Sequence, residues 1–150
     1  MTMTLSFIVR VEQLQETLAP LEKIDKINDQ NDNVLRDLFW SGVIHKFWIA
    51  VTLSCRLTRH MLVKYHGLPS TIEYTRREIL NQAYQANIIN DEKWLEMLRY
   101  RNKISRTHEP FAPTDEWCER ITEEYLPLLK ELLEYCQKLI DEGQQQSEET

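Results

Sequence analysis

The apolar stretch LFWSGVIHKFWIAVTLSC, residues 38–55, decides the fold of this chain. Its hydrophobic side chains would cover nearly the whole circumference of a helix, which is typical of a helix buried in a protein core. His45 and Lys46 stand in the middle of the stretch and argue against a membrane span. We predict that this helix runs from about Val34 to Tyr65 and that Gly67 forms its C-terminal cap.

The all-round apolar surface of this helix also bears on assembly. A helix that is apolar on all sides must be buried on all sides, and one small bundle core rarely surrounds it completely. Helices of the same chain can cover both faces, or a second face can meet another subunit. We favour the second arrangement slightly. It predicts a homodimer, formed mainly through this helix and the basic helix from Trp94 to His108.

Apolar residues at three- and four-residue steps predict a first helix over residues 5–24. Pro20 should kink or break it, because the proline ring clashes with the carbonyl group four residues earlier. Further along, Thr75 and Glu78 form a capping box that opens a short helix. Asn90 is expected to cap the next helix, which carries the basic segment.

Pro110 and Pro113 end the basic helix, and Thr114 is expected to cap a final helix that Pro127 bends. The predicted core positions of this helix lie close to a heptad stripe: Trp117, Ile121, Tyr125, Leu128, Leu132, Cys136 and Leu139. The chain therefore predicts an all-α domain over residues 1–142, an antiparallel up-and-down bundle of four long helices and one short helix. Residues 143–150 are predicted to form a disordered polar tail.

The length and composition predict one soluble, cytoplasmic domain. The chain has 150 residues, 28% of them charged, with a formal net charge of -6 and few glycines and prolines. Three widely spaced cysteines without a paired-cysteine metal motif fit a reducing compartment. The first residues lack the charged segment and cleavage site of a signal peptide. We predict no membrane segment, no metal and no cofactor.

Most signatures of catalysis are missing from the sequence. No second histidine stands four residues from His60, and the glycines at 42, 67 and 143 form no phosphate-binding loop. The four tryptophans sit at core spacing and are assigned to packing: Trp40, Trp48, Trp94 and Trp117. The one segment whose spacing suits chemistry is WLEMLRYRNKISRTH, residues 94–108.

This segment holds the densest positive charge of the chain. On a helix, Arg101 and His108 stand seven residues apart and lie nearly on one line, roughly 10 Å apart along the axis. A second basic line beside it consists of Arg99, Lys103 and Arg106. An arginine can hold a phosphate by two parallel hydrogen bonds, and a histidine can move protons near neutral pH. Together they can cleave RNA without a metal, or only grip an anion.

The same positive charge has a plainer interpretation. Basic residues on an amphipathic helix usually form a solvated face or pair with carboxylates. The chain has 24 Asp and Glu residues that can serve as partners. From the spacing alone, a solvated face is the simpler interpretation, and a site that handles phosphate is the alternative.

The segment from Asn90 to Glu109 resembles the signature of the nucleotidyltransferase substrate-binding proteins, a branch of the HEPN superfamily. The residues at matching places are Trp94, Leu95, Met97, Leu98, Arg101, Asn102, Ser105 and Thr107. Upstream, the segment from Arg77 to Ala83 is similar to a second element of that family. The resemblance covers most of residues 30–135 and is specific in the block from Trp94 to Thr107.

The chain departs from the family pattern at four positions. Arg106 stands where the family usually has its histidine, and His108 stands where it usually has a tyrosine. In the long helix, Trp48 replaces the usual glutamate and Cys55 the usual tryptophan. The spacing from Arg101 to His108 still fits the longest arginine-to-histidine spacing of HEPN ribonucleases.

The resemblance implies a dimeric helical bundle and a partner, a small, separately encoded nucleotidyltransferase in a toxin–antitoxin type of pair. One implied function is a substrate-binding subunit that binds a nucleotide or RNA phosphate, or the partner enzyme, around Arg101. The neighbours implied in that binding are Arg99, Asn102, Lys103, Ser105 and Arg106. The alternative is a metal-independent endoribonuclease, with Arg101 at the scissile phosphate and His108 as general base. The displaced histidine predicts weak or absent cleavage.

Overall fold

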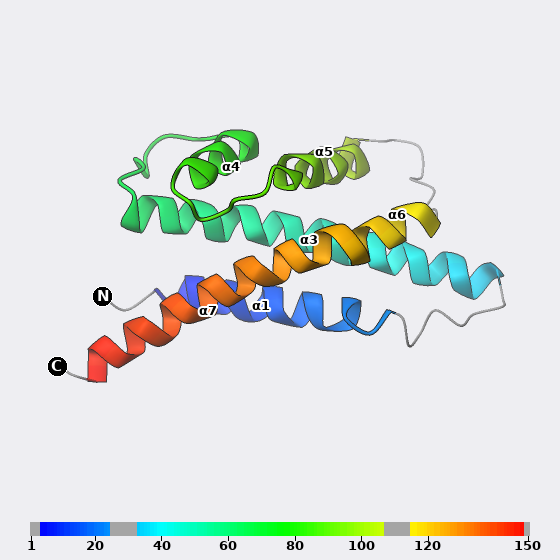
Figure 1. Ribbon diagram of the computed structural model, residues 1–150, viewed down its shortest axis with the longest axis horizontal. Helices are drawn as coiled ribbons and strands as arrows, with labels where there is room; N and C mark the ends of the chain where they lie inside the picture. The colour runs from blue at the N-terminus through cyan, green and yellow to red at the C-terminus, as the bar shows by residue number, and fades with distance from the viewer. Residues whose placement is uncertain (1–3, 25–32, 107–114, 149–150) are drawn as a thin grey trace.

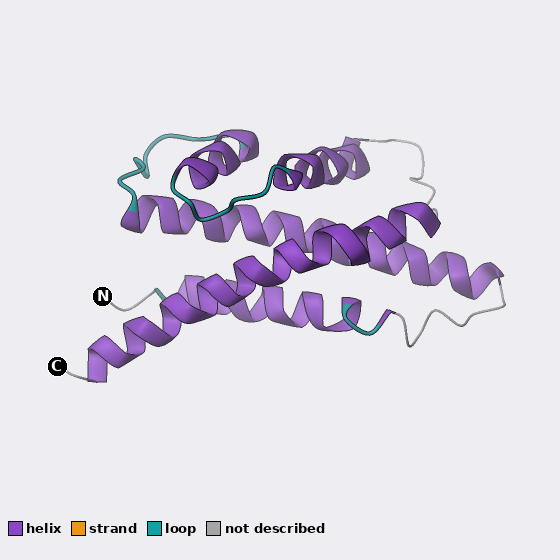
Figure 2. Cartoon of the chain, viewed as in Figure 1, coloured by secondary structure: helices purple, strands orange, loops and turns teal. Residues whose placement is uncertain are grey.

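The computed structural model describes residues 4–24, 33–106 and 115–148, and these residues form helices and no strand (Figures 1 and 2). The helices are α1 (Leu5–Leu21), α3 (Asn33–Tyr65), α4 (Arg76–Gln85), α5 (Lys93–Arg106), α6 (Asp115–Arg120) and α7 (Leu126–Glu148). A π-helical turn, η1 (Ile121–Tyr125), joins α6 to α7, so the last three elements form one continuous helix. The predicted all-α bundle is confirmed.

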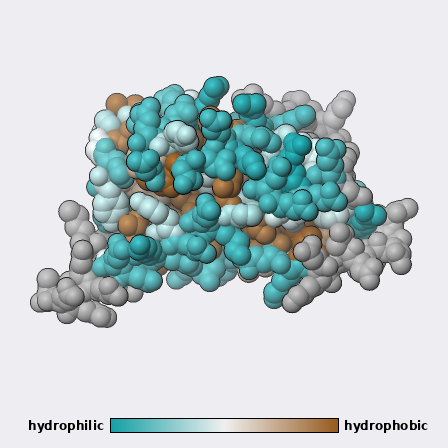
Figure 3. All heavy atoms as spheres, viewed as in Figure 1, coloured by the Kyte–Doolittle hydropathy of each residue, from teal (hydrophilic) through white to brown (hydrophobic). Residues whose placement is uncertain are grey.

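Helix α3 lies between two pairs of helices, as Figure 1 shows. Helices α1 and α7 pack against it and against each other, and α4 and α5 do the same on another side. Along the long axis, α1 and α5 run in one direction and α3 and α7 in the other. The arrangement is therefore up-and-down. The face seen in Figure 1 is mostly hydrophilic, with hydrophobic residues showing between the polar ones near its middle (Figure 3).

The central position of α3 explains its continuous apolar sequence. Its buried hydrophobic residues are Trp40, Val43, Ile44, Phe47, Ala50, Val51, Leu53, Leu57, Met61 and Leu62. Three buried hydroxyl groups, those of Thr52, Ser54 and Thr58, each donate to the carbonyl four residues earlier at 2.7–2.9 Å. These bonds satisfy the polar groups inside the core. The helix ends as predicted, because Gly67 has a φ of 73° and the Leu68 N–H bonds back to the Leu62 carbonyl.

Helices of the same chain cover much of the apolar surface of α3, and the predicted contact of a second face with another subunit stays a prediction. Its first two turns expose the apolar residues Val34 at 68%, Leu35 at 50% and Leu38 at 63%, and its last residue, Tyr65, is 44% exposed. By length and composition, Val34–Tyr65 could cross a membrane, but 56% of its most apolar window is buried inside the protein. This burial is consistent with the core helix of a soluble protein.

The caps of the shorter helices follow the sequence with one correction. Thr75 caps α4 and accepts a hydrogen bond from the Glu78 N–H at 3.1 Å, which confirms the capping box. The expectation that Asn90 caps α5 is wrong, because Asp91 Oδ1 accepts the Lys93 N–H at 2.9 Å instead. Ile88 and Ile89 are buried after the end of α4, and this places Asn90 in the exposed connection that follows.

Two prolines interrupt their helices. Pro20 ends α1, as the sequence predicts, and Pro127 follows a widened turn. Helix α1 ends at Leu21, one residue after Pro20. Before Pro127, the Leu126 N–H donates to the Ile121 carbonyl, five residues earlier, in the π-helical turn η1. A proline has no N–H with which to continue the α-helical pattern, so the turn before it widens.

The predicted core stripe of the last helix is confirmed. Its five central positions are buried, and Trp117 and Leu139 at the two ends are partly buried. Helix α7 continues to Glu148, beyond residue 143 at which the polar tail was predicted to begin. The sequence boundary therefore does not coincide with the end of the helix. Pro110, Pro113 and Thr114 lie outside the described residues.

Candidate functional site

Arg101 is a buried cation whose partners are all neutral. Its side chain is only 7% exposed. Its Nε donates to Thr52 Oγ1 on α3 at 3.0 Å, and its Nη1 donates to Asn102 Oδ1 at 3.1 Å. Its Cζ lies 4.7 Å from the centroid of the Trp48 ring, a cation–π contact. The guanidinium is therefore held on three sides without a carboxylate.

No described carboxylate compensates the charge of Arg101. Burial, followed by the positive charges of Arg76 and Arg56, lowers the pKa of Arg101 from its ordinary value. The side chain still stays protonated, because an arginine does not lose its proton in a protein. Cys55 lies nearby, but burial raises the pKa of its thiol to about 11, so the thiol is neutral at physiological pH. Burying a cation in this way is costly unless an anion completes the site.

Arg101 lines a groove of about 760 Å³ formed by three parts of the chain. The lining residues are Cys55, Arg56 and Arg59 of α3, Tyr74 to Arg77 and Ile79 around the start of α4, and Leu98, Arg101 and Asn102 of α5. Five of them are arginines, and none of the lining residues in the described part of the chain is Asp or Glu. We call this feature the arginine groove.

The local fold brings these arginines to the lining of one groove. Arg59 Nη2 donates to the Ser70 carbonyl at 3.2 Å, which ties α3 to the connection that leads into α4. The Thr75 cap then fixes Arg76 and Arg77 as the first two residues of α4. A helix N-terminus carries unpaired N–H groups and the positive end of the helix dipole. Within the described residues, none of the groove arginines forms an ion pair with a carboxylate.

The structure separates the residues that the sequence grouped into one site. Asn102 lies beside Arg101 in the arginine groove. Arg99 instead lines another cavity, of about 730 Å³, together with the carboxylates Asp91, Glu92 and Glu96. Lys103 is exposed. The backbone of Ser105 and Arg106 ends α5, while their side chains and His108 lie outside the described part of the structure.

Sequence reasoning missed the arginines that come from the other helices: Arg56, Arg59, Arg76 and Arg77. Arg76 lay in the predicted capping box and Arg77 also in the family resemblance, while Arg56 and Arg59 lay within the predicted long helix, and none of the four was assigned to a site. One local signal exists, since residues 56 and 59 are three apart and so share a face of α3. Their meeting with α4 and α5 depends on tertiary packing.

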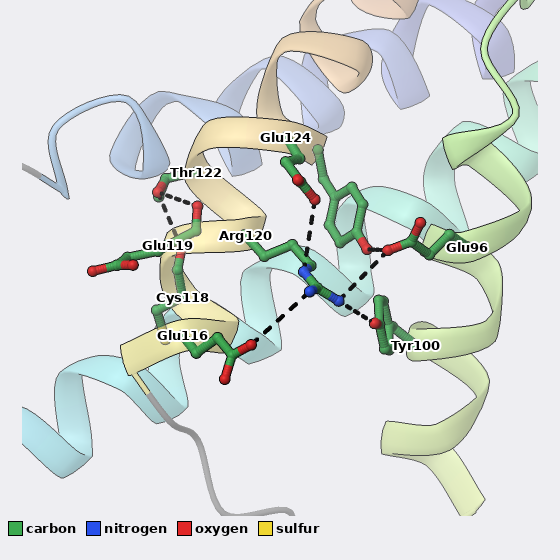
Figure 4. A network of polar contacts seen from close by, with 9 residues as sticks. Glu96, Tyr100, Glu116, Cys118, Glu119, Arg120, Thr122 and Glu124 are labelled. Carbon is green, nitrogen blue, oxygen red and sulfur yellow. Dashed lines mark hydrogen bonds and ion pairs between the residues drawn. The ribbon is translucent and has the colours of Figure 1, made fainter.

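A polar network holds α5 against the last helix (Figure 4). The Tyr125 hydroxyl donates to Glu96 Oε1 at 2.5 Å, and Arg120 donates to the Tyr100 hydroxyl. Arg120 also forms ion pairs with Glu96 and Glu124, both at 3.6 Å. Burial and then the bond to Glu96 raise the pKa of Tyr125, so its hydroxyl remains a donor. The network fixes the helix that carries Arg101.

The groove is suited to holding an anion rather than to moving a proton. Its charged groups are arginines, which cannot act as bases. Its thiol, that of Cys55, is protonated because burial raises its pKa. Among residues 4–24, 33–106 and 115–148, no group of three His, Cys, Asp or Glu residues is placed to hold a metal ion.

Comparison with known proteins places this chain in a family. Residues 9–138 match the family described as "Nucleotidyltransferase substrate binding protein like". The chain belongs to this family. The match includes every residue of the arginine groove, and it confirms the resemblance drawn from the sequence. As a nucleotidyltransferase substrate-binding protein, the chain is associated by family with a nucleotidyltransferase partner. No curated protein and no solved structure matched the chain.

Proposed function

We propose that the arginine groove binds a phosphate group of a nucleotide or RNA, and that the chain is the substrate-binding subunit of a separately encoded small nucleotidyltransferase. One observation carries the proposal. Five arginines and no described carboxylate line the groove, and the most buried of the five, Arg101, has only neutral partners among the described residues. A bound phosphate supplies the missing negative charge.

The shape of the arginine side chain suits this role. A guanidinium presents parallel N–H groups that match two phosphate oxygens. Arg101 uses Nε and Nη1 for Thr52 and Asn102, and its Nη2 makes no hydrogen bond within the described residues. That amino group is therefore left for a ligand. Arg76 and Arg77 at the start of α4 would approach the same anion from a second helix.

The partner and the setting belong to the same proposal. Arg99, Lys103 and Arg106 form the surface proposed to contact the nucleotidyltransferase, since a basic patch on an acidic protein suits an acidic partner. The pair is proposed to be a cytoplasmic HEPN and nucleotidyltransferase system of the toxin–antitoxin type. The chain is further proposed to form a homodimer through α3 and α5.

The binding experiment compares two arginines on the same helix. We expect Arg101→Ala to lower the affinity for a nucleoside triphosphate, measured by isothermal titration calorimetry, by at least about tenfold. Arg99→Ala is the matched control, because it removes the same charge from a cavity that contains carboxylates. Its affinity should stay within about twofold of the wild type. Circular dichroism checks that both variants are folded. If the two folded variants bind the triphosphate with equal affinity, the proposal is contradicted.

A second candidate function is a metal-independent endoribonuclease. The observation in its favour is Arg101 itself, a guanidinium held rigidly where it can contact a scissile phosphate. The reaction also needs a base, and the proposed base is His108. Arg106, at the family's usual histidine position, stays protonated and cannot serve. We therefore propose phosphate binding as the principal function and weak or absent cleavage.

A further inference from the structure

A second basic cavity lies beside the arginine groove, between α1 and α3. It encloses about 340 Å³ and is lined by Thr4, Arg10, Arg56, Arg59, His60, Val63 and Lys64. None of these lining residues is Asp or Glu. Arg56 and Arg59 line both cavities, so the positive charge continues from one into the other. Among the described residues, none of the segment from Trp94 to Ile104 lines this second cavity.

Two neutral side chains of the second cavity, those of Thr4 and His60, are held by contacts with α1. Thr4 caps α1, and its Oγ1 lies 3.4 Å from His60 Nε2. The ring of His60 packs against Phe7, with 5.0 Å between the centroids. Burial, and then the charges of Lys64 and Arg10, lower the pKa of His60. His60 is therefore neutral at physiological pH and can donate or accept a hydrogen bond beside the cations.

Together the two cavities have a length and a charge that exceed the needs of one nucleotide. Five arginines line the first, and Arg10 and Lys64 add two further cations in the second. Along α3, the distance from Thr52, which holds Arg101, to Lys64 is about 18 Å. In a nucleic-acid helix each strand carries one phosphate per about 3.4 Å of axis, so this distance corresponds to several phosphates.

We propose that the two cavities form one continuous basic track, which binds the sugar–phosphate backbone of a single-stranded nucleic acid. The proposal rests on the proposed binding of phosphate in the arginine groove and names the ligand of that site. A single strand is flexible enough to cross α3 at Arg56 and Arg59, whereas a duplex is stiff over this length. Tyr74, half-buried in the lining of the groove, is placed to stack against a base.

The test separates the two cavities by charge removal. Binding of a labelled single strand of about twelve nucleotides is measured by fluorescence anisotropy at several salt concentrations. The double variant Arg10→Gln with Lys64→Gln removes the two cations that only the second cavity contains. The control, Lys23→Gln with Lys138→Gln, removes two exposed lysines that line neither cavity. RNA and DNA strands of one sequence are compared, since a preference for RNA reveals contacts to the 2′-hydroxyl.

The expected result is selective. The Arg10 and Lys64 variant should bind the strand about tenfold or more weakly, and its salt slope should fall by about 1.4, or roughly 0.7 per lost contact. Its affinity for a nucleoside triphosphate should equal that of the wild type, while Arg101→Ala should weaken both ligands. The control variant should match the wild type for both.

Two outcomes overturn the track. One is a strand affinity and salt slope that fall no further in the Arg10 and Lys64 variant than in the control. The other is a wild type that binds no strand while the same variant loses a nucleotidyltransferase partner, which identifies a protein as the occupant. In both cases, triphosphate binding that depends on Arg101 still supports the proposed function. Absence of triphosphate and strand binding in the wild type overturns the proposed function as well.

Discussion

The guanidinium of Arg101 lies over the indole ring of Trp48, with 4.7 Å between Cζ and the ring centroid. The sequence resemblance places a glutamate at this position in the family, and a glutamate there would pair with Arg101. The indole attracts the cation through its π face but carries no charge. In this chain the Trp48 contact therefore leaves the positive charge of Arg101 without a carboxylate among the described residues.

Replacing Trp48 by glutamate should abolish much of the phosphate binding. The new carboxylate competes with the ligand for Arg101, so we expect Trp48→Glu to lower triphosphate affinity by about tenfold or more. Trp48→Phe, which keeps an aromatic face under the guanidinium, should bind within about threefold of the wild type. Calorimetric titration of both variants measures the difference, and a Trp48→Glu protein that binds normally refutes this role of Arg101.

Metal-free cleavage of RNA should be weak or absent. The displaced histidine moves its Cα by about 3 Å along a continuing helix and turns it by about 200°. Such a shift exceeds the tolerance of catalytic geometry, about half an ångström. The measurement is an RNA cleavage assay in a chelator, with wild type, Arg101→Ala and His108→Ala. Cleavage by the wild type that disappears in both variants would establish the endoribonuclease instead.

The nucleotidyltransferase should be released by charge reversal on α5. Changing Arg99, Lys103 and Arg106 to glutamate should reduce co-purification of the partner several-fold, and added salt should weaken the wild-type complex in the same direction. A double reversal at the exposed residues Lys23 and Lys138 serves as the control. If the triple variant co-purifies with the partner as well as the wild type does, this surface is not the contact with the nucleotidyltransferase.

The homodimer should depend on the exposed first turns of α3. We expect Leu35→Glu with Leu38→Glu to shift the protein toward monomer in sedimentation velocity at micromolar concentration, because a buried charge weakens an apolar contact. Leu5→Glu, at a residue 77% exposed on α1, should leave the assembly unchanged. Phe47 is unsuitable for this test, since it is fully buried and stacks on Tyr125. A wild type that sediments only as a monomer contradicts the dimer.

Stability should fall above pH 9. Burial raises the pKa of Cys55 to about 11 and that of Cys136 to about 12, from an ordinary value of 9.0. The unfolded chain releases these protons first, so each thiol stabilises the fold fully below pH 9 and loses that effect between pH 9 and its folded pKa. Each contributes up to about 1.4 kcal/mol per pH unit in that window.

Urea unfolding at a series of alkaline pH values measures this slope. Cys136→Ala should give a shallower decline than the wild type between pH 9 and pH 12, whatever its stability at neutral pH. The cavity that the smaller side chain leaves lowers the free energy of unfolding equally at every pH, so it does not change the slope. Identical slopes in the two proteins would show that Cys136 is not the titrating group.

The fold follows from local patterns that a sequence displays directly. The limits of α3, its glycine cap and the Thr75 capping box depend on neighbouring residues, and all three are as predicted. The cap of α5 was misplaced by one residue, because Asn90 and Asp91 are both good capping residues. Which of the two residues caps the helix depends on where the chain leaves the core after the buried residues Ile88 and Ile89, and this is a tertiary effect.

The site follows from the sequence only where it lies on one helix. Arg101 and Asn102 are adjacent and were found together. Arg99 was grouped with them by charge, but two of the carboxylates around it, Asp91 and Glu92, come from the turn before α5, whose position depends on packing. Trp48 was assigned to the core, and its contact with Arg101 joins helices that are 53 residues apart in sequence. Such contacts leave no periodic trace in a single sequence.

The π-helical turn at Ile121–Tyr125 holds one residue more than an α-helical turn. The residues before it therefore face directions that are shifted by one position relative to the residues after it. A related chain that lacks one residue in this turn would rotate everything before it by about 100°. Its counterpart of Arg120 would then turn away from Tyr100 and Glu96, although the core of α7 would stay in place. An alignment with such a chain would need a one-residue gap at the turn, and that residue would then distinguish chains that keep the Arg120 contacts with α5 from chains that lose them.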